Sequence, residues 1–159
     1  MPIVFLKWVQ TRLKKQNIVA VTKQLFDYLE SRSSKQISFS FSSTDKELYT
    51  NLNTELFGWV IENLIKNGID AMSGKGELNL QIENEPKRVK ITLSDTGKGM
   101  SKKLFKQIFK PGFTTKKRGW GLGLSLSKRI IEDYHNGKIF VKKSEIDKGT
   151  TFQILLNKV

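Results

Sequence analysis

The sequence predicts an α+β fold, a two-layer α/β sandwich in which three main helices cover one face of a mixed, mostly antiparallel five-stranded sheet. Two observations lead to this prediction. First, segments with helical periodicity and pairs of segments with strand periodicity follow one another along the chain, in an order typical of one mostly antiparallel sheet. Second, 159 residues with 38% hydrophobic content can build one hydrophobic core. We expect residues 18–159 to form this domain, and the basic residues 1–17 to be a linker or the remnant of a preceding helical domain.

Each predicted element follows from the spacing of apolar residues. A period near 3.6 predicts helices over residues 18–32, from about 54 to 72, and from about 122 to 134. Alternation with polar residues predicts strands around residues 37–41, 78–82, 89–93, 138–143 and 150–156. Residues 45–53 are predicted to be a loop. The long stretch 98–119 is predicted to hold only a short helix near 102–108, and loops of this length are usually functional.

The composition limits the classes of function. The chain has no cysteine, which excludes disulfides and thiolate metal sites, and no apolar run long enough to cross a bilayer. Its net charge of +13 fits either a surface for nucleic acid or anionic lipid, or a basic solvated surface beside a phosphate site. Because the lysines are spread along the chain, we favour the second interpretation. We therefore expect a cytoplasmic domain that contacts neither nucleic acid nor membrane.

The first motif that carries chemistry is a pair of asparagines on the second helix. Asn63 and Asn67 are four residues apart, so both amides project from one side of the helix. An amide oxygen is a neutral ligand suited to Mg²⁺ that takes its other ligands from water and phosphate. The alternative is a pair of surface or capping asparagines. Because asparagine lowers helix propensity, two of them at the border of the core favour a functional role.

The second motif is the segment Asp95-Thr-Gly-Lys-Gly-Met100, directly after a predicted strand. A carboxylate can accept a hydrogen bond from the exocyclic amine of a nucleobase. The two glycines, Gly97 and Gly99, allow the backbone to come close to a flat ring. An ordinary Asp-Gly turn would explain this segment equally well if it stood alone.

The third motif is Gly119-Trp-Gly121-Leu-Gly123-Leu124, which precedes the last helix. Unpaired backbone amides at a helix N-terminus can bind phosphate oxygens. The spacing differs from that of a P-loop and from a dinucleotide-binding fingerprint, and a flexible glycine hinge is the alternative. The three motifs together predict a nucleotide pocket.

These motifs resemble those of the ATP-binding catalytic domain of bacterial sensor histidine kinases, in the superfamily that includes gyrase B, heat-shock protein 90 and mismatch-repair ATPases. The resemblance runs from about Ile18 to Val159. It includes an N box at 62–71, glycine boxes at 95–100 and 119–124, a phenylalanine box at 108–116 and a Gly-Thr strand at 148–152. The chain departs from the family pattern at Trp120 and at Gly68, where alanine is commoner. The resemblance implies a Bergerat-type fold.

The resemblance also implies roles for individual residues. Asn67 would hold Mg²⁺, Asn63 would lie beside the phosphates, Asp95 would bind the adenine amine, and residues 101–120 would form a lid anchored by Phe109 and Phe113, which could equally be core residues. Asn63 and Asn67 would be the catalytic residues. The full set expected to contact ATP and Mg²⁺ is Asn63, Lys66, Asn67, Asp95, Gly97, Gly99, Met100, Thr115, Lys116, Gly119, Gly121, Leu122, Gly123, Leu124 and Thr150.

One position in the N box separates subclasses of this superfamily. Its ATPases carry a glutamate, four residues before the metal-binding asparagine, that activates water; here that residue is Asn63, which cannot be a general base. Glu62 projects about 100° away round the helix. The resemblance therefore implies phosphoryl transfer to a protein rather than hydrolysis, with catalysis by positioning and charge neutralisation.

The resemblance implies a two-component phosphorelay in which this domain donates the γ-phosphate of ATP to a histidine on a separate dimerisation and phosphotransfer domain, and thence to a response regulator. The single histidine, His135, ends the last predicted helix and is not expected to be the phosphoacceptor. The parent protein of this cytoplasmic domain could be membrane-anchored. The alternatives are a protein-serine kinase of the same fold, a non-catalytic nucleotide-sensing module, or a basic nucleic-acid-binding module.

Overall fold

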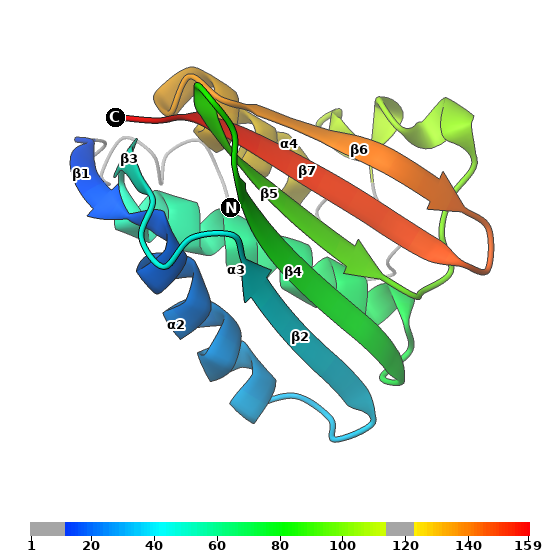
Figure 1. Cartoon of the computed structure of the whole chain (residues 1–159). Coiled ribbons are helices and arrows are strands. Elements are labelled where there is room, and N and C mark those ends of the chain that lie inside the picture. Colours follow the sequence, from blue (N-terminus) through cyan, green and yellow to red (C-terminus); the bar gives the residue numbers. More distant parts are fainter. Residues whose placement is uncertain (1–11, 114–122) are drawn as a thin grey trace.

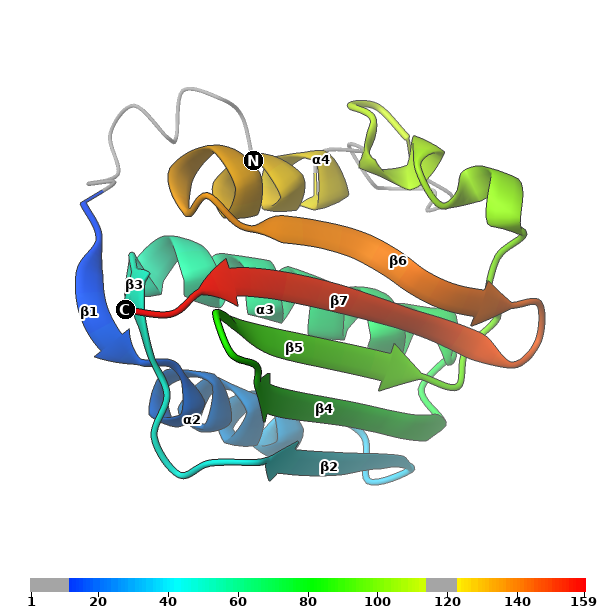
Figure 2. The same ribbon diagram turned by 45° about the horizontal axis from the view of Figure 1, so that its top comes forward.

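The computed structural model describes residues 12–113 and 123–159, and it has the predicted two-layer α+β architecture (Figure 1). The helices α2 and α3 lie on one side of the main sheet, which Figure 2 shows from its open face. In chain order the elements are β1 (Lys14–Asn17), α2 (Ile18–Ser31), β2 (Ile37–Ser43), β3 (Tyr49–Leu52), α3 (Thr54–Ala71), β4 (Gly76–Asn84), β5 (Arg88–Asp95), η1 (Lys102–Leu104), η2 (Gln107–Phe109), α4 (Gly123–Arg129), η3 (Ile130–Tyr134), β6 (Lys138–Glu145) and β7 (Gly149–Asn157).

The main sheet has five strands in the order β2-β4-β5-β7-β6. Only β2 and β4 run parallel, and the other three pairs are antiparallel, so the predicted mixed and mostly antiparallel sheet is confirmed. The parallel pair is possible because α3 connects the two strands as a crossover. The central strand β5 ends at Asp95, opposite Leu78 near the start of β4.

The core lies between the sheet and α3. The helix buries one broad face, and the inward residues of β4 and β5 alternate with polar residues as the period of a strand requires. The side chains at the centre of this layer are at most 2% exposed, and they are Leu56, Phe57, Val60, Ile61, Leu64 and Ile65 of α3 with Leu78, Leu80, Ile82, Val89 and Ile91 of the strands. At about 25 cal/mol per Å² of buried apolar area, this layer supplies the main stabilisation of the fold.

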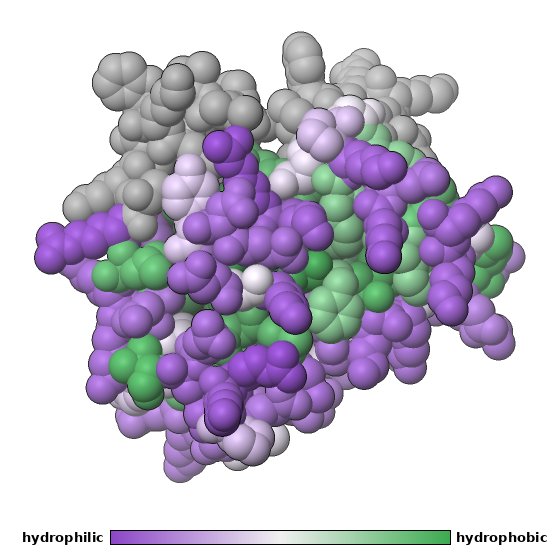
Figure 3. Space-filling model, turned by 90° about the horizontal axis from the view of Figure 1, so that it is seen from above, coloured by the Kyte–Doolittle hydropathy of each residue, from purple (hydrophilic) through white to green (hydrophobic). Residues whose placement is uncertain are grey.

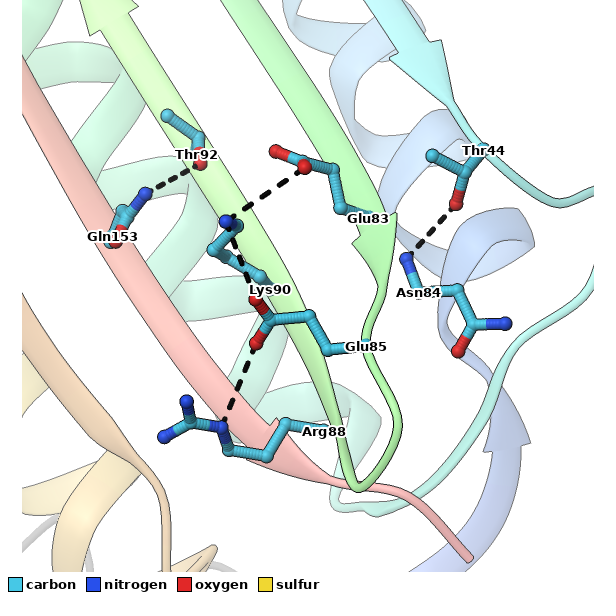
Figure 4. Close-up of polar contacts among 8 residues, drawn as sticks. All are labelled: Thr44, Glu83, Asn84, Glu85, Arg88, Lys90, Thr92 and Gln153. Carbon is cyan, nitrogen blue, oxygen red and sulfur yellow. Dashed lines mark hydrogen bonds and ion pairs between the residues drawn. The ribbon is translucent and has the colours of Figure 1, made fainter.

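The other face of the sheet is polar. In Figure 4, Lys90 of β5 points between Glu83 and Glu85, with its Nζ 3.8 and 3.4 Å from their carboxylates. Further along, Gln153 of β7 donates from Nε2 to Thr92 Oγ1 at 3.2 Å. Within residues 12–113 and 123–159, helices cover one face of the main sheet and leave the other face polar.

Two details of the fold differ from the prediction. Residues 45–53 contain the strand β3, which pairs antiparallel with β1, inside the stretch that the sequence analysis assigned to a linker. Strands of four residues with little apolar alternation give no clear sequence signal. Residues 102–109 form the two short 3₁₀ turns η1 and η2, and the last helix ends as the π-helical turn η3.

The surface is mainly hydrophilic. Figure 3 shows one face of the molecule, on which hydrophobic areas are separated by hydrophilic side chains. In residues 12–113 and 123–159, the exposed large hydrophobic side chains are Tyr28, Tyr49, Ile146 and Val159. No helix in this part of the chain is long and apolar enough to cross a bilayer.

His135 connects the N-terminus of α3 to η3, the last turn of the final helix. Asn53 is the N-cap of α3 and accepts from the Leu56 N–H, while its own backbone N–H donates to His135 Nε2 at 3.1 Å. His135 Nδ1 lies 2.9 Å from the Ile130 carbonyl and must donate to it, so the ring is neutral with its proton on Nδ1. His135 is only 5% exposed, and burial lowers its pKa below the usual 6.5, against the opposing bond to Ile130.

The His135 contact predicts a loss of stability on acidification. Because the folded-state pKa is lowered, the unfolded chain takes up a proton near pH 6.5 while the folded domain does not, so the free energy of unfolding falls as pH drops below about 6.5. Urea unfolding between pH 8 and 5 will show this decline. His135→Gln should lose about 1–3 kcal/mol at pH 7 through the broken hydrogen bonds, and should show less of the decline.

Asp95 has a raised pKa and therefore stabilises the folded domain on acidification, but it does so in both proteins and cancels in their difference. Equal pH slopes in the wild type and in His135→Gln would contradict the neutral, buried imidazole.

Candidate functional site

The candidate site follows one border of α3. Its components are the loop after β5, the hairpin between β6 and β7, and the start of α4. At 1.5 Å per residue, the part of α3 from Asn63 to Gly68 is about 7.5 Å long, so these segments meet within the length of a nucleotide.

Asp95 is the carboxylate of the site. Its Oδ1 accepts from the backbone N–H of Gly97 at 2.9 Å and of Thr150 at 3.3 Å, which joins the loop after β5 to the start of β7. Within residues 12–113 and 123–159, no hydrogen bond to Oδ2 is present. Burial raises the pKa of Asp95, and the two backbone hydrogen bonds oppose that rise. The group is thus a fixed acceptor with one oxygen held and the other open.

The loop after β5 packs directly against the end of α3. The Lys98 N–H donates to the Ala71 carbonyl at 2.9 Å, and a Cβ on Gly97 would lie 2.6 Å from the backbone C and O atoms of Ala71. Gly99 has a φ of 66° and packs against the backbone of Glu145, so a side chain there would be both strained and blocked. The two glycines are therefore needed for the loop to touch both neighbours.

Gly68 lies directly beneath Asp95. A Cβ at this position would be 3.4 Å from the Asp95 Cβ and 3.5 Å from its Oδ2. This contact places the carboxylate against the buried side of α3, next to the turn of the helix that carries Asn67.

Asn63 joins α3 to α4. Its Nδ2 donates to the buried hydroxyl of Ser127 at 3.2 Å, and that hydroxyl donates to the Gly123 carbonyl at 2.8 Å. The amide lies over Gly123, since a Cβ on that glycine would be 2.7 Å from Asn63 Oδ1. The N box and the last glycine of the third motif are therefore in direct contact.

Lys66 is engaged on the exposed side of α3. Its Nζ lies 2.8 Å from Glu62 Oε1, and both side chains are well exposed. Any contact of Lys66 with a phosphate requires it to leave this ion pair, which is worth little at the surface.

The hairpin between β6 and β7 closes the side of the site opposite α3. Ser144 Oγ accepts from the Met100 N–H at 2.9 Å and lies 3.0 Å from the Gly149 carbonyl and 2.8 Å from Thr150 Oγ1. Thr150 is buried, and Leu124 packs against the core from the start of α4. The Ser144 hydroxyl thus joins Met100 to Thr150, and the Thr150 N–H donates to Asp95.

Some predicted site residues fall on segments that the structure does not describe. Five of the expected ligand contacts lie outside residues 12–113 and 123–159, and they are Thr115, Lys116, Gly119, Gly121 and Leu122. Trp120 lies outside as well.

Phe109 belongs to the core. It is 8% exposed and packs edge-on against Phe152 of β7, with ring centroids 6.3 Å apart, while Lys128 Nζ lies 5.6 Å from its ring centroid. Phe113 is partly buried against the same core. The core interpretation of Phe109 is therefore confirmed, and a role of the two phenylalanines in anchoring a lid stays a prediction.

Sequence reasoning missed two residues that organise the site. Ser127 lies four residues after Gly123 on α4, and Ser144 lies on β6, and neither belongs to a recognisable motif. A serine facing the core side of a predicted helix was the one available signal for Ser127, because a buried hydroxyl needs a partner.

The matched family is consistent with this geometry. Residues 53–159, more than half of the chain, match the family described as histidine kinase-, DNA gyrase B- and HSP90-like ATPase. The chain belongs to this family. Members are ATPase-like domains, so the chain is a domain of a nucleotide-binding family.

Relatives of this ATPase-like domain include kinases. Sporulation kinase C of Bacillus subtilis (strain 168) is 33% identical over 90% of this chain and 33% of its own length. The catalytic domain of histidine kinase ThkA in a nucleotide-free form is 29% identical with a TM-score of 0.83, covering 92% of this chain and 95% of that one. A structure of ThkA in complex with the response regulator protein TrrA has a TM-score of 0.80 and 27% identity, covering 92% and 42%. The chain spans a third or less of the first curated relatives.

Close packing at Gly97 predicts that Gly97→Ala damages the ATPase-like domain. The new methyl group must displace the Ala71 backbone, and overpacking of this kind costs about 1–3 kcal/mol. Chemical denaturation will measure the loss. Gly58→Ala is the matched control, since its nearest contact would be 3.8 Å away and alanine in a helix gains about 1 kcal/mol over glycine. An unchanged free energy of unfolding in Gly97→Ala would contradict the described contact.

Proposed function

We propose that this chain is the Mg²⁺·ATP-binding catalytic domain of a two-component sensor histidine kinase. It donates the γ-phosphate of ATP to a histidine on a separate dimerisation and phosphotransfer domain. The observation that carries the proposal is the state of Asp95, whose Oδ1 is held by the amides of Gly97 and Thr150 while Oδ2 has no partner among the described residues. This carboxylate lies beside α3, whose border carries Asn63 and Asn67.

The adenine would bind at Asp95. An exocyclic amine can donate to Oδ2, and a hydrogen bond to a charged acceptor contributes about 1.5–3 kcal/mol. Gly97, Gly99, Met100 and Thr150 would surround the ring, which the close backbone packing of the loop supports.

The triphosphate would extend along α3 towards α4. Asn63, Lys66 and the amides of Gly123 and Leu124 would face it, and Asn67 would ligate Mg²⁺. The neutral amide oxygens on this border fit the preference of Mg²⁺ for oxygen ligands beside phosphate. When bound, the ion would neutralise phosphate charge. The remaining contacts proposed from the family resemblance lie outside the described residues, and they are Thr115, Lys116, Gly119, Gly121 and Leu122.

The N box favours transfer over hydrolysis. Asn63 has no basic atom that could deprotonate water, and its NH₂ group donates to Ser127. Glu62, the adjacent carboxylate, is paired with Lys66 on the exposed side of the helix. The N-box asparagines would instead position the nucleotide for an incoming nucleophile. Such positioning is the main requirement of phosphoryl transfer.

The proposed acceptor and partners lie outside this domain. His135 is the single histidine of the sequence, and it is buried with both ring nitrogens engaged, so it cannot accept a phosphoryl group without unfolding its surroundings. A response regulator is the proposed final acceptor, supported by the relative ThkA, whose structure contains the regulator TrrA. We place the domain in the cytoplasm, where ATP is abundant, and propose that the domain itself touches neither membrane nor nucleic acid.

The substitution Asp95→Asn tests the adenine assignment. The amide would keep its oxygen towards Gly97 and Thr150 and turn its NH₂ towards the base, so two donors would face each other when ATP binds. Isothermal titration should show ATP affinity falling about 10- to 100-fold. Affinity for ITP, which carries a carbonyl at the same position, should fall less or rise.

Asp27→Asn is the matched control because Asp27 pairs with Lys23 on the exposed side of α2. Unchanged ATP affinity in Asp95→Asn, or an equal loss for ATP and ITP, would overturn the adenine assignment.

A further inference from the structure

We propose that Ser127 is a positioning residue that fixes the orientation of the Asn63 amide and so presents Asn63 Oδ1 to the metal ion beside the phosphates. The inference rests on the proposed function, because it assigns a task to Asn63 within that site. It concerns a residue of α4 that lies outside each of the sequence motifs.

Ser127 connects the two helices of the site at a fully buried position. It is 0% exposed, its hydroxyl lies 2.8 Å from the Gly123 carbonyl on its own helix, and Asn63 Nδ2 lies 3.2 Å from the same oxygen. A serine bonded to the carbonyl four residues earlier satisfies itself within its helix. That local bond does not explain the second contact, in which Ser127 Oγ accepts from Asn63 of α3.

The direction of each bond follows from counting protons. The serine hydroxyl has a single proton, and the Gly123 carbonyl can only accept, so the proton lies between Ser127 Oγ and that carbonyl. Ser127 Oγ can then only accept from Asn63, and the one donor on that side chain is its NH₂ group. The amide orientation therefore follows from the network, although oxygen and nitrogen of an asparagine have the same shape.

This orientation decides which atom of Asn63 is left for a ligand. With Nδ2 committed to Ser127, Oδ1 remains as the acceptor, and it lies over Gly123, where a Cβ would be 2.7 Å away. The reverse orientation would turn an NH₂ group towards a cation and place Oδ1 against a hydroxyl whose proton is already used. Outer-shell partners that orient a ligand in this way typically change metal affinity 10- to 100-fold when removed.

Gly123 completes the arrangement. Any side chain at that position would meet the Asn63 amide, with Nδ2 at 3.0 Å and Oδ1 at 2.7 Å from the Cβ. The backbone of Gly123 and the hydroxyl of Ser127 thus hold the amide from two sides. A chain of hydrogen bonds through Asn63 Nδ2, Ser127 Oγ and the Gly123 carbonyl oxygen therefore links the N box to the start of α4.

The test compares Ser127→Ala with Ser33→Ala. Ser33 Oγ donates to the Leu29 carbonyl at 2.7 Å, the same kind of bond to the carbonyl four residues earlier, but it lies after the end of α2, and among the described residues no hydrogen bond joins it to Asn63. Titration of a non-hydrolysable ATP analogue with and without Mg²⁺ should show Ser127→Ala losing about 10-fold in affinity with the ion and less than about 2-fold without it. Ser33→Ala should change neither affinity.

A second readout needs no nucleotide. In the free domain, the side-chain NH₂ signals of Asn63 in ¹H–¹⁵N spectra should show one proton protected from solvent exchange, and Ser127→Ala should remove this protection. Ser127→Thr, which keeps the hydroxyl, should restore part of it.

These outcomes separate the inference from the proposed function. If the wild type binds Mg²⁺ with the nucleotide and Ser127→Ala keeps the same Mg²⁺ dependence, the positioning role is wrong while the proposed function stands. Equal losses in Ser127→Ala and Ser33→Ala would show a general effect on helix stability and would likewise overturn it. If the wild type does not bind the nucleotide at all, the proposed function fails and the inference fails with it, whatever the spectra show of the Asn63 hydrogen bond.

Discussion

The contact of α3 with the sheet fixes the positions of Asn63 and Asn67, the two residues of the N box on which the candidate site depends. Six side chains from Leu56 to Ile65 are almost completely buried against β4 and β5, so the helix cannot rotate without exposing them. That fixed rotation puts Asn63 and Asn67 at the border of the core. The N-terminus of the helix is held by the Asn53–His135 bond, and its C-terminus by the loop that contains Gly97.

Asp95 combines its proposed role in binding with a cost to stability. Burial raises its pKa, which means that the charged form is less stable here than in water. Two backbone amides offset part of that cost and also hold one oxygen in place. Among the described residues Oδ2 has no hydrogen-bond partner, so it can accept from a ligand donor. A part-buried acceptor of this kind favours a ligand with an amine at one defined point, and that is the source of the specificity proposed for the base.

Much of the fold and part of the site could be predicted from the sequence. Long elements with strong periodicity, such as α3 and the pair β4–β5, were predicted to within a few residues because burial of one face sets their pattern. The strands β1 and β3 were missed because each has four residues and its partner lies far away in the chain. Ser127 and Ser144 were missed for a related reason. Their importance comes from contacts 64 and 44 residues away, with Asn63 and Met100, which no local pattern encodes.

The most direct test of the central claim is a backbone NMR titration of the domain with Mg²⁺ and a non-hydrolysable ATP analogue. The claim is that one nucleotide lies along the border of α3, between Asp95 and Gly123. The account predicts the largest shift changes at Gly68, Gly97, Thr150 and Gly123, with little change at Gly58 between α2 and α3. Shift changes gathered around Gly58, or a response at Gly97 without one at Gly123, would contradict it.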